Sequence, residues 1–219
     1  MKVTGSEAKH GGDSRREVLL KLGTASAGGA MAASGTQTAA ARRTIQCDVV
    51  VIGGGTAGAI AAIQAGRLGA RTVLVEAGSQ LGGTMTTGGV DFPGLFHAWG
   101  KQIIAGIGWA LVTAAVKLNG DQLPDFSIPY GTNHPKHQVR LNGALYAALA
   151  EEACVQAGVE LRYYESPSSI GRAENGWRVE LVGKGMQVEV AARQLIDCTG
   201  NAAAIGLMEI GRASCRERV

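Results

Sequence analysis

The feature that most constrains the fold is a β-branched apolar run, Cys47–Ile52, that leads directly into the glycine-rich turn Gly53–Gly58. A run of this kind is typical of a strand buried on both faces of a parallel sheet. The Gly/Ala-rich segment 59–68 then predicts a helix closed by Gly69, and Thr72–Val75 predicts a second buried strand. The order strand, helix, strand predicts an α/β fold built on a parallel sheet.

The glycines of the turn are spaced as a dinucleotide-binding loop requires. Gly53 would make the tight turn, Gly55 would let a pyrophosphate approach the backbone, and Gly58 would let the helix pack closely on the strand. The pyrophosphate would lie at the helix N-terminus, at Thr56 and Ala57, where free N–H groups and the helix dipole favour an anion. Such a motif alone is weak in a glycine-rich chain, but the flanking strands and helix strengthen it.

An acidic residue ends the second predicted strand. Glu76 follows Gly58 by eighteen residues, a position from which a carboxylate can accept hydrogen bonds from ribose hydroxyls. An acid rather than an arginine at this position argues against a 2′-phosphate, and hence against NADP. Strand, glycine turn, helix, strand and acid together predict a site for an adenine dinucleotide.

A second glycine-rich segment, Leu81–Gly89, follows Glu76 closely, and residues 53–108 hold fifteen of the 33 glycines. This arrangement resembles the FAD-dependent oxidoreductases of the glutathione-reductase-like superfamily. More narrowly, it resembles the bacterial FAD-dependent oxidoreductase family related to the succinate dehydrogenase and fumarate reductase flavoproteins. The resemblance implies a Rossmann-like FAD-binding domain with FAD as cofactor. It also implies that the second glycine pair and the residue after it continue the FAD site: Gly82, Gly83 and Thr84.

The chain beyond residue 140 predicts further α/β elements. A helix is predicted over 141–158, where leucines recur every four residues before a terminal glycine. Val159–Tyr163 alternates as a strand, and Trp177–Leu181 and Val188–Val190 form a hairpin-like pair that we assign to a β-meander.

The segment Gln194–Asn201 resembles the strand and Thr-Gly-Asp turn that returns to the FAD site in this superfamily. That resemblance implies backbone contacts to the cofactor from Thr199 and Gly200. Asn201 stands where an acid is more usual, which weakens any specific role for its side chain. The resemblance extends to about residue 208.

Residues 90–135 are predicted to be an insertion on the substrate side of the site. Six of the ten aromatic residues and two of the four histidines lie in this stretch, where aromatic rings could shield a flavin or a flat substrate from water. His97 could take a substrate proton while hydride leaves, and Arg140 could hold a carboxylate. Each is also explained by an ordinary structural role, so both are candidates only.

The N-terminal segment predicts export. Ser14–Lys21 resembles the twin-arginine motif, and the apolar run Leu22–Ala33 after it is short of the roughly 20 residues that span a bilayer. The twin-arginine export machinery is therefore an expected partner, with a periplasmic or secreted location and no stable membrane span.

The formal charge of +3 lies at the two ends of the chain. Residues 42–208 carry thirteen basic and thirteen acidic side chains, which gives no reason to expect nucleic acid as a partner. Cys47, Cys154 and Cys198 are too widely spaced for a zinc site or a disulfide framework, and no metal site is expected.

Three segments are therefore expected. Residues 1–41 form an export signal, and residues 42–208 form a partial FAD-binding domain. Residues 209–219 resemble the translation of a sequencing adapter. The leading hypothesis is an exported FAD-dependent oxidoreductase that moves hydride between a small organic substrate and flavin. The alternatives are an NAD-linked dehydrogenase with a simple Rossmann domain, and an inactive truncated fragment that keeps only part of the dinucleotide site.

Overall fold

A computed structural model describes residues 43–208 of the chain. The export-like segment 1–41 and the adapter-like segment 209–219 both lie outside the described residues. The hypotheses about these two segments therefore stay predictions.

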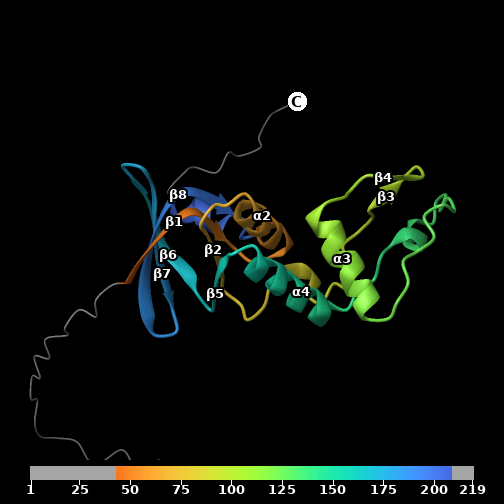
Figure 1. Ribbon diagram of the computed structural model, residues 1–219, viewed down its shortest axis with the longest axis horizontal. Helices are drawn as coiled ribbons and strands as arrows, with labels where there is room; N and C mark the ends of the chain where they lie inside the picture. Colours follow the sequence, from red (N-terminus) through yellow and green to blue (C-terminus); the bar gives the residue numbers. More distant parts are fainter. Residues whose placement is uncertain (1–42, 209–219) are drawn as a thin grey trace, which may run out of the picture. The chain divides into compact units, whose positions relative to one another are not determined.

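A six-stranded mixed sheet forms the centre of the described part (Figure 1). The strand order is β5-β2-β1-β8-β7-β6, in which β5, β2, β1 and β8 run parallel and β8, β7 and β6 run antiparallel. The parallel strands carry the predicted βαβ unit, and the antiparallel strands form the predicted meander. The bounds are β1 Arg43–Ile52, β2 Thr72–Glu76, β5 Glu160–Tyr163, β6 Ser166–Ala173, β7 Gly176–Gly183 and β8 Met186–Asp197.

Two helices pack together on one face of the parallel strands. Helix α2, Thr56–Arg67, links β1 to β2 and contacts α4, Gly143–Gln156 (Figure 1). Asn142 begins α4 by accepting hydrogen bonds from the N–H groups of the second and third helical residues. Helix α3, Ile107–Leu118, packs against both, and the short α5, Ala203–Leu207, follows β8.

Strand β8 differs from the sequence prediction, which placed two short segments there. It is one strand of 12 residues, because its backbone pairs with β1 from Val188 opposite Arg43 to Asp197 opposite Ile52. The exposed polar residues Arg193 and Gln194 break the apolar pattern in the sequence, but the pairing keeps the same register on both sides of Arg193. One strand therefore joins the parallel sheet to the meander.

Several elements had no sequence signal strong enough to predict them. Strand β6 is polar and contains Pro167, which an edge strand tolerates because one side of its backbone needs no partner. Helix α3 lies inside the predicted insertion, where the sequence signal consists only of aromatic residues and histidines. The remaining elements are short: β3 His97–Ala98, β4 Lys101–Gln102, and the 3-10 helices Gly83–Met85 and His134–His137.

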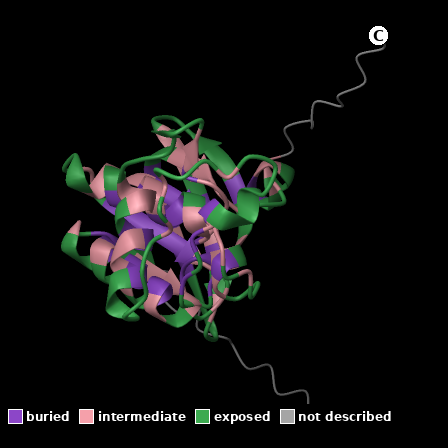
Figure 2. Ribbon diagram, turned by 90° about the vertical axis from the view of Figure 1, so that its right-hand side faces the viewer, coloured by how far each residue is buried: buried purple, intermediate pink, exposed green. Residues whose placement is uncertain are grey.

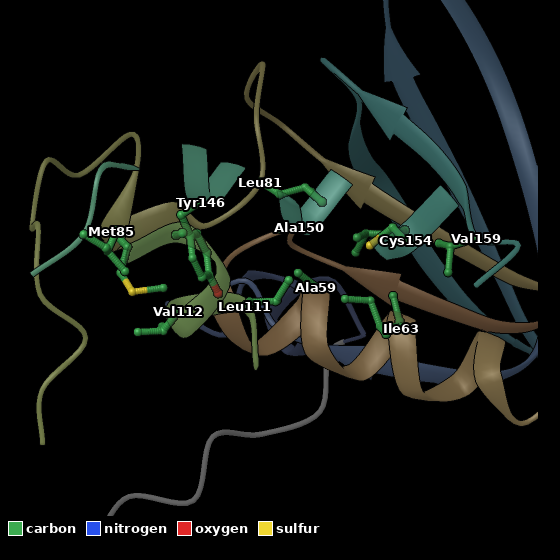
Figure 3. Close-up of a cluster of buried hydrophobic side chains, with 14 of the residues drawn as sticks. Ala59, Ile63, Leu81, Met85, Leu111, Val112, Tyr146, Ala150, Cys154 and Val159 are labelled. Carbon is green, nitrogen blue, oxygen red and sulfur yellow. The ribbon is translucent and has the colours of Figure 1, made fainter. Parts of the chain in front are cut away.

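Buried apolar side chains form two clusters, one on each face of β1 and β2. Figure 2 shows the buried residues, in purple, concentrated in the strands at the centre of the described part. Neighbouring residues in a strand point to opposite faces, so Val51 joins the helix side and Val50 joins the meander side. Figure 3 shows the helix-side cluster, with Tyr146 of α4 among Met85 and Val112. Cys47, Cys154 and Cys198 are free thiols.

Candidate functional site

Backbone atoms pack closely against the glycine turn after β1 at two of its positions. Gly53 has φ +99°, and a Cβ there would lie 2.5 Å from the carbonyl oxygen of Cys198. A Cβ on Gly58 would overlap the carbonyl oxygen of Gly53. Both positions therefore require glycine for the fold itself, because helix α2 and the turn after β8 lie too close for a side chain.

Gly55 is different, because a Cβ built on it would meet no atom within 4 Å. Its φ of −60° is open to any residue, so neither strain nor packing requires glycine here. Gly55 immediately precedes α2, and no side chain caps that helix. The first-turn N–H groups, at Thr56 and Ala57, therefore lie beside open space, which is the arrangement that favours a bound anion.

Glu76 ties the end of β2 to the glycine turn. The N–H of Gly54 donates to Glu76 Oε2 and the N–H of Gly78 donates to Oε1, each at 2.6 Å. A carboxylate has about four acceptor positions, so these two bonds leave capacity for further donors such as hydroxyls. The carboxylate is thus positioned by backbone groups and could accept hydrogen bonds from a ribose.

The second glycine pair packs directly on the first turn. The N–H of Gly82 donates to the carbonyl of Gly54 at 2.9 Å, and the Thr56 hydroxyl donates to the carbonyl of Gly82 at 3.2 Å. A Cβ on Gly83 would lie 3.1 Å from the Cα of Gly55. The exposed Thr84 follows in the same short helix. The two glycine segments, 24 or more residues apart in sequence, therefore form one backbone surface.

The turn after β8 reaches the same place. The N–H of Cys198 donates to the carbonyl of Ile52 at 2.8 Å, which sets the turn beside the end of β1. Asp197 then organises the turn by accepting from the N–H and hydroxyl of Thr199 at 2.9 and 2.7 Å, and from the N–H of Ile205 at 3.1 Å. Gly200 follows with φ +77°. Sequence reasoning had assigned no role to Asp197, although a lone acid at a strand end was a signal.

A cavity of about 460 Å³ lies beside these groups. Three of the sequence-predicted site residues line it: Gly53, Glu76 and Thr199. Residues 165–167 also line the cavity, and they had no sequence signal, because the segment belongs to no motif. Glu165 in that segment is only 4% exposed and forms two hydrogen bonds with the Arg162 guanidinium, at 2.6 and 2.8 Å.

The two candidate catalytic residues lie in different surroundings. His97 stacks on Phe126 with ring centroids 3.8 Å apart, and burial, with a contribution from the charge of His137, lowers the pKa of His97. Arg140 is exposed and pairs with Asp91 at 2.7 Å. Within the described residues no hydrogen bond, ion pair or ring contact joins His97 directly to Arg140.

Two negative findings concern residues 43–208 alone. No group of three or more His, Cys, Asp or Glu side chains is arranged there to hold a metal ion. None of the described helices is both long enough and apolar enough to cross a membrane.

Comparison with known proteins adds a family and a fold. The sequence profile described as FAD dependent oxidoreductase matches residues 48–217. A nicotine dehydrogenase from Pseudomonas putida is 37% identical over 105 residues, which cover 41% of this chain and 22% of that protein.

Two solved structures share the fold. Thermovibrio ammonificans THI4 aligns with a TM-score of 0.50 at 13% identity, over 74% of this chain and 61% of that one. The flavin-dependent monooxygenase PieE, solved with FAD and substrate, aligns with a TM-score of 0.52 at 18% identity, over 74% of this chain and 32% of that one. The chain thus spans less than two thirds of the length of each of these proteins, including the nicotine dehydrogenase.

Proposed function

The chain belongs to the FAD dependent oxidoreductase family, and from that premise we propose that its two glycine segments hold the pyrophosphate of FAD. The observation that carries the proposal is the open position at Gly55, beside the uncapped N-terminus of α2. Packing explains why Gly53 and Gly58 are glycine, but it does not explain Gly55. A phosphate close to the backbone does explain it, because any Cβ would occupy that space.

The other residues of the site fit the remaining parts of the dinucleotide. Glu76 would accept hydrogen bonds from the ribose, since backbone N–H groups already hold its carboxylate in place. The 460 Å³ cavity beside it would take the adenosine end, between Thr199 and the 165–167 wall. Asp197 would contribute indirectly, because it accepts the hydrogen bonds from Thr199 that hold this turn in shape.

For the whole protein, we propose a two-electron oxidation of a small organic substrate. The chemistry that bound FAD supplies is the acceptance of a hydride from a substrate carbon. His97 is proposed as the base that takes the accompanying substrate proton, and its lowered pKa keeps it neutral near pH 7, as a base must be. Arg140 already pairs with Asp91, so a substrate carboxylate would have to compete for it.

Replacing Gly55 with alanine tests the proposal. Gly55→Ala should leave the free energy of unfolding within about 0.5 kcal/mol of wild type, because the methyl meets nothing in the protein. It should weaken FAD binding at least tenfold, or about 1.4 kcal/mol, because the methyl takes the place of the phosphate. Quenching of flavin fluorescence on titration of the full chain measures this affinity.

Gly171→Ala is the matched control. Gly171 lies in β6, and a Cβ built on it would also meet no atom within 4 Å. It belongs to neither glycine segment and does not line the cavity beside Glu76. The control should bind FAD as the wild type does. Equal FAD affinity in Gly55→Ala and wild type would show that the dinucleotide does not lie on this turn.

We also propose that residues 1–41 direct export by the twin-arginine route, which the motif Ser14–Lys21 supports. Replacing both Arg15 and Arg16 with lysine keeps the charge and removes the guanidinium pair. Export should then fall strongly, measured as the share of protein in the periplasmic fraction of cells. Unchanged export of the double variant would contradict the proposal.

A further inference from the structure

Glu165, which lines the cavity beside Glu76, belongs to a buried ion pair. Arg162 Nε and Nη2 donate to its two carboxylate oxygens at 2.6 and 2.8 Å, and the Arg162 and Glu165 side chains are only 10% and 5% exposed. Two parallel bonds of this kind fix a guanidinium and a carboxylate in one relative orientation. Arg162 Nη1 also donates to Glu160 at 3.0 Å, so a second carboxylate holds the guanidinium. The position of Glu165 is therefore fixed relative to strand β5.

A pair of this kind supplies geometry more than stability. Removing two charges from water costs about as much free energy as their attraction returns, so a buried ion pair adds little net stability. Well-packed apolar side chains of similar size often stabilise a fold as well or better. What Arg162 and Glu165 supply, and apolar residues would not, is one defined position for the segment that carries Glu165.

The backbone of the same segment is strained. Tyr164 and Glu165 form the two-residue link between β5 and β6, and Tyr164 has φ +58°, a left-handed conformation that a bulky residue rarely adopts. The Tyr164 N–H donates to the Gly78 carbonyl at 3.2 Å, and the Glu165 N–H donates to the Glu76 carbonyl at 3.3 Å. Such strain persists only where surrounding contacts impose it, and it is concentrated at ligand sites.

These contacts connect the ion pair to the dinucleotide site. Glu76 accepts hydrogen bonds from the glycine turn through its side chain and from Glu165 through its carbonyl. Ser166 and Pro167 follow Glu165 as the first residues of β6 and line the cavity with it. A shift of Glu165 would therefore move this part of the cavity lining. Arg162 does not line the cavity itself, but it holds the residue that does.

We propose that Arg162 and Glu165 are positioning residues of the FAD site: their ion pair fixes the 165–167 wall, against which the adenine packs, and so sets a preference for a purine at that end. The inference rests on the proposed function, which places the adenosine end in this cavity. It adds a source of base selectivity, half of which lies outside the cavity. Arg162 also neutralises Glu165, so the pair gives the wall no net charge.

Two nucleoside diphosphates test the base preference. ADP and UDP share the ribose and the two phosphates, and they differ only in the base. Isothermal titration calorimetry of the full chain, prepared without flavin, should show ADP binding at least about tenfold more tightly than UDP. Equal affinities for ADP and UDP would overturn the inference and leave the ribose and phosphate contacts of the proposed function intact. Binding of neither nucleotide, together with no binding of FAD, would overturn the proposed function and the inference with it.

An apolar replacement of the pair separates positioning from stability. Arg162→Met combined with Glu165→Leu leaves no buried charge unpaired, so the urea midpoint should stay near or above that of wild type. The double variant should nevertheless bind ADP at least about fivefold more weakly, and its UDP affinity should change by less than about twofold. A full preference for ADP in a double variant as stable as wild type would contradict the assignment.

A conservative variant and a matched control complete the test. Arg162→Lys keeps the charge but cannot form the two parallel bonds, so it should lose part of the preference for ADP. The control is a second ion pair, Arg178 with Glu189 at 3.3 Å, which joins β7 to β8 and does not line the cavity. Arg178→Met combined with Glu189→Leu should keep the full preference. A full preference in a folded Arg162→Lys, or a lost preference in the control, would overturn the proposal.

Discussion

At the scale of single residues, the structure distinguishes glycines that close packing requires from a glycine that it does not require. Gly53 and Gly58 are required by packing, whereas Gly55 has open space around its Cα. Among the large side chains, Tyr146 poses the same question, namely whether its hydroxyl contributes to the fold. It is fully buried in the helix-side cluster, and its hydroxyl makes no hydrogen bond of good geometry within residues 43–208, although the Thr56 side chain lies near it (Figure 3).

Removing that hydroxyl tests whether it contributes to stability. Tyr146→Phe should leave stability unchanged or raise it by up to about 1 kcal/mol, because an unpaired buried hydroxyl costs free energy. Tyr146→Ala should lose about 3–5 kcal/mol through the lost apolar contacts and the cavity left behind. Urea unfolding followed by circular dichroism measures both. A loss of more than about 1 kcal/mol in Tyr146→Phe would mean that the hydroxyl is bonded.

At the scale of elements, the site depends on how closely α2 approaches the end of β1. Gly58 lies in the first turn of α2, directly over the carbonyl oxygen of Gly53. The turn after β8 packs at the same place, because the N–H of Cys198 donates a hydrogen bond to the carbonyl oxygen of Ile52. Three elements therefore converge where only backbone atoms fit.

Gly58→Ala is expected to separate these elements. The added methyl overlaps a backbone oxygen, so α2 must shift, and stability should fall by about 1–3 kcal/mol. The expected contrast with Gly55→Ala, which should leave stability unchanged, can be measured by thermal unfolding of both variants. Similar melting temperatures for wild type and Gly58→Ala would show that the helix accommodates a side chain.

At the scale of the whole molecule, the pH dependence of stability should reflect the half-buried His97 of the insertion. Burial, followed by the charge of His137, lowers the pKa of His97 from its ordinary value of 6.5. The unfolded chain therefore takes up a proton at a pH where the folded chain does not. Stability from this source is complete above about pH 6.5 and is lost as the pH falls below it.

The melting temperature should accordingly fall between pH 7.5 and pH 5.5. His97→Phe keeps an aromatic ring to stack on Phe126 and removes the titrating group, so its melting temperature should fall less over the same interval. Parallel pH profiles for wild type and His97→Phe would contradict this assignment of the pH dependence.

Much of the dinucleotide-binding unit could be predicted from the sequence, because its signals are local. The β-branched run before Gly53 and the acid at Glu76 predicted β1, α2 and β2. The family match confirms FAD as the cofactor, and the shared fold confirms the α/β prediction. The narrower resemblance to the succinate dehydrogenase flavoproteins stays a prediction, as do the roles of the individual site residues.

For the insertion, the sequence revealed the composition but not the structure. Its aromatic residues and histidines were evident, but helix α3 and the stacking of His97 on Phe126 were not. Residues in this stretch are brought together by chain reversals that have no regular period, so no pattern of apolar spacing reports them.

The sequence by itself predicted which backbone positions could take a phosphate and where an acid ends a strand, since both depend on residues close together in the chain. The tertiary structure alone decided that Gly82 bonds to Gly54 and that Glu165 forms part of the cavity wall. The physical reason is the range of the interactions. Turn, strand and helix preferences act over a few residues, whereas these contacts exist only after distant segments have packed.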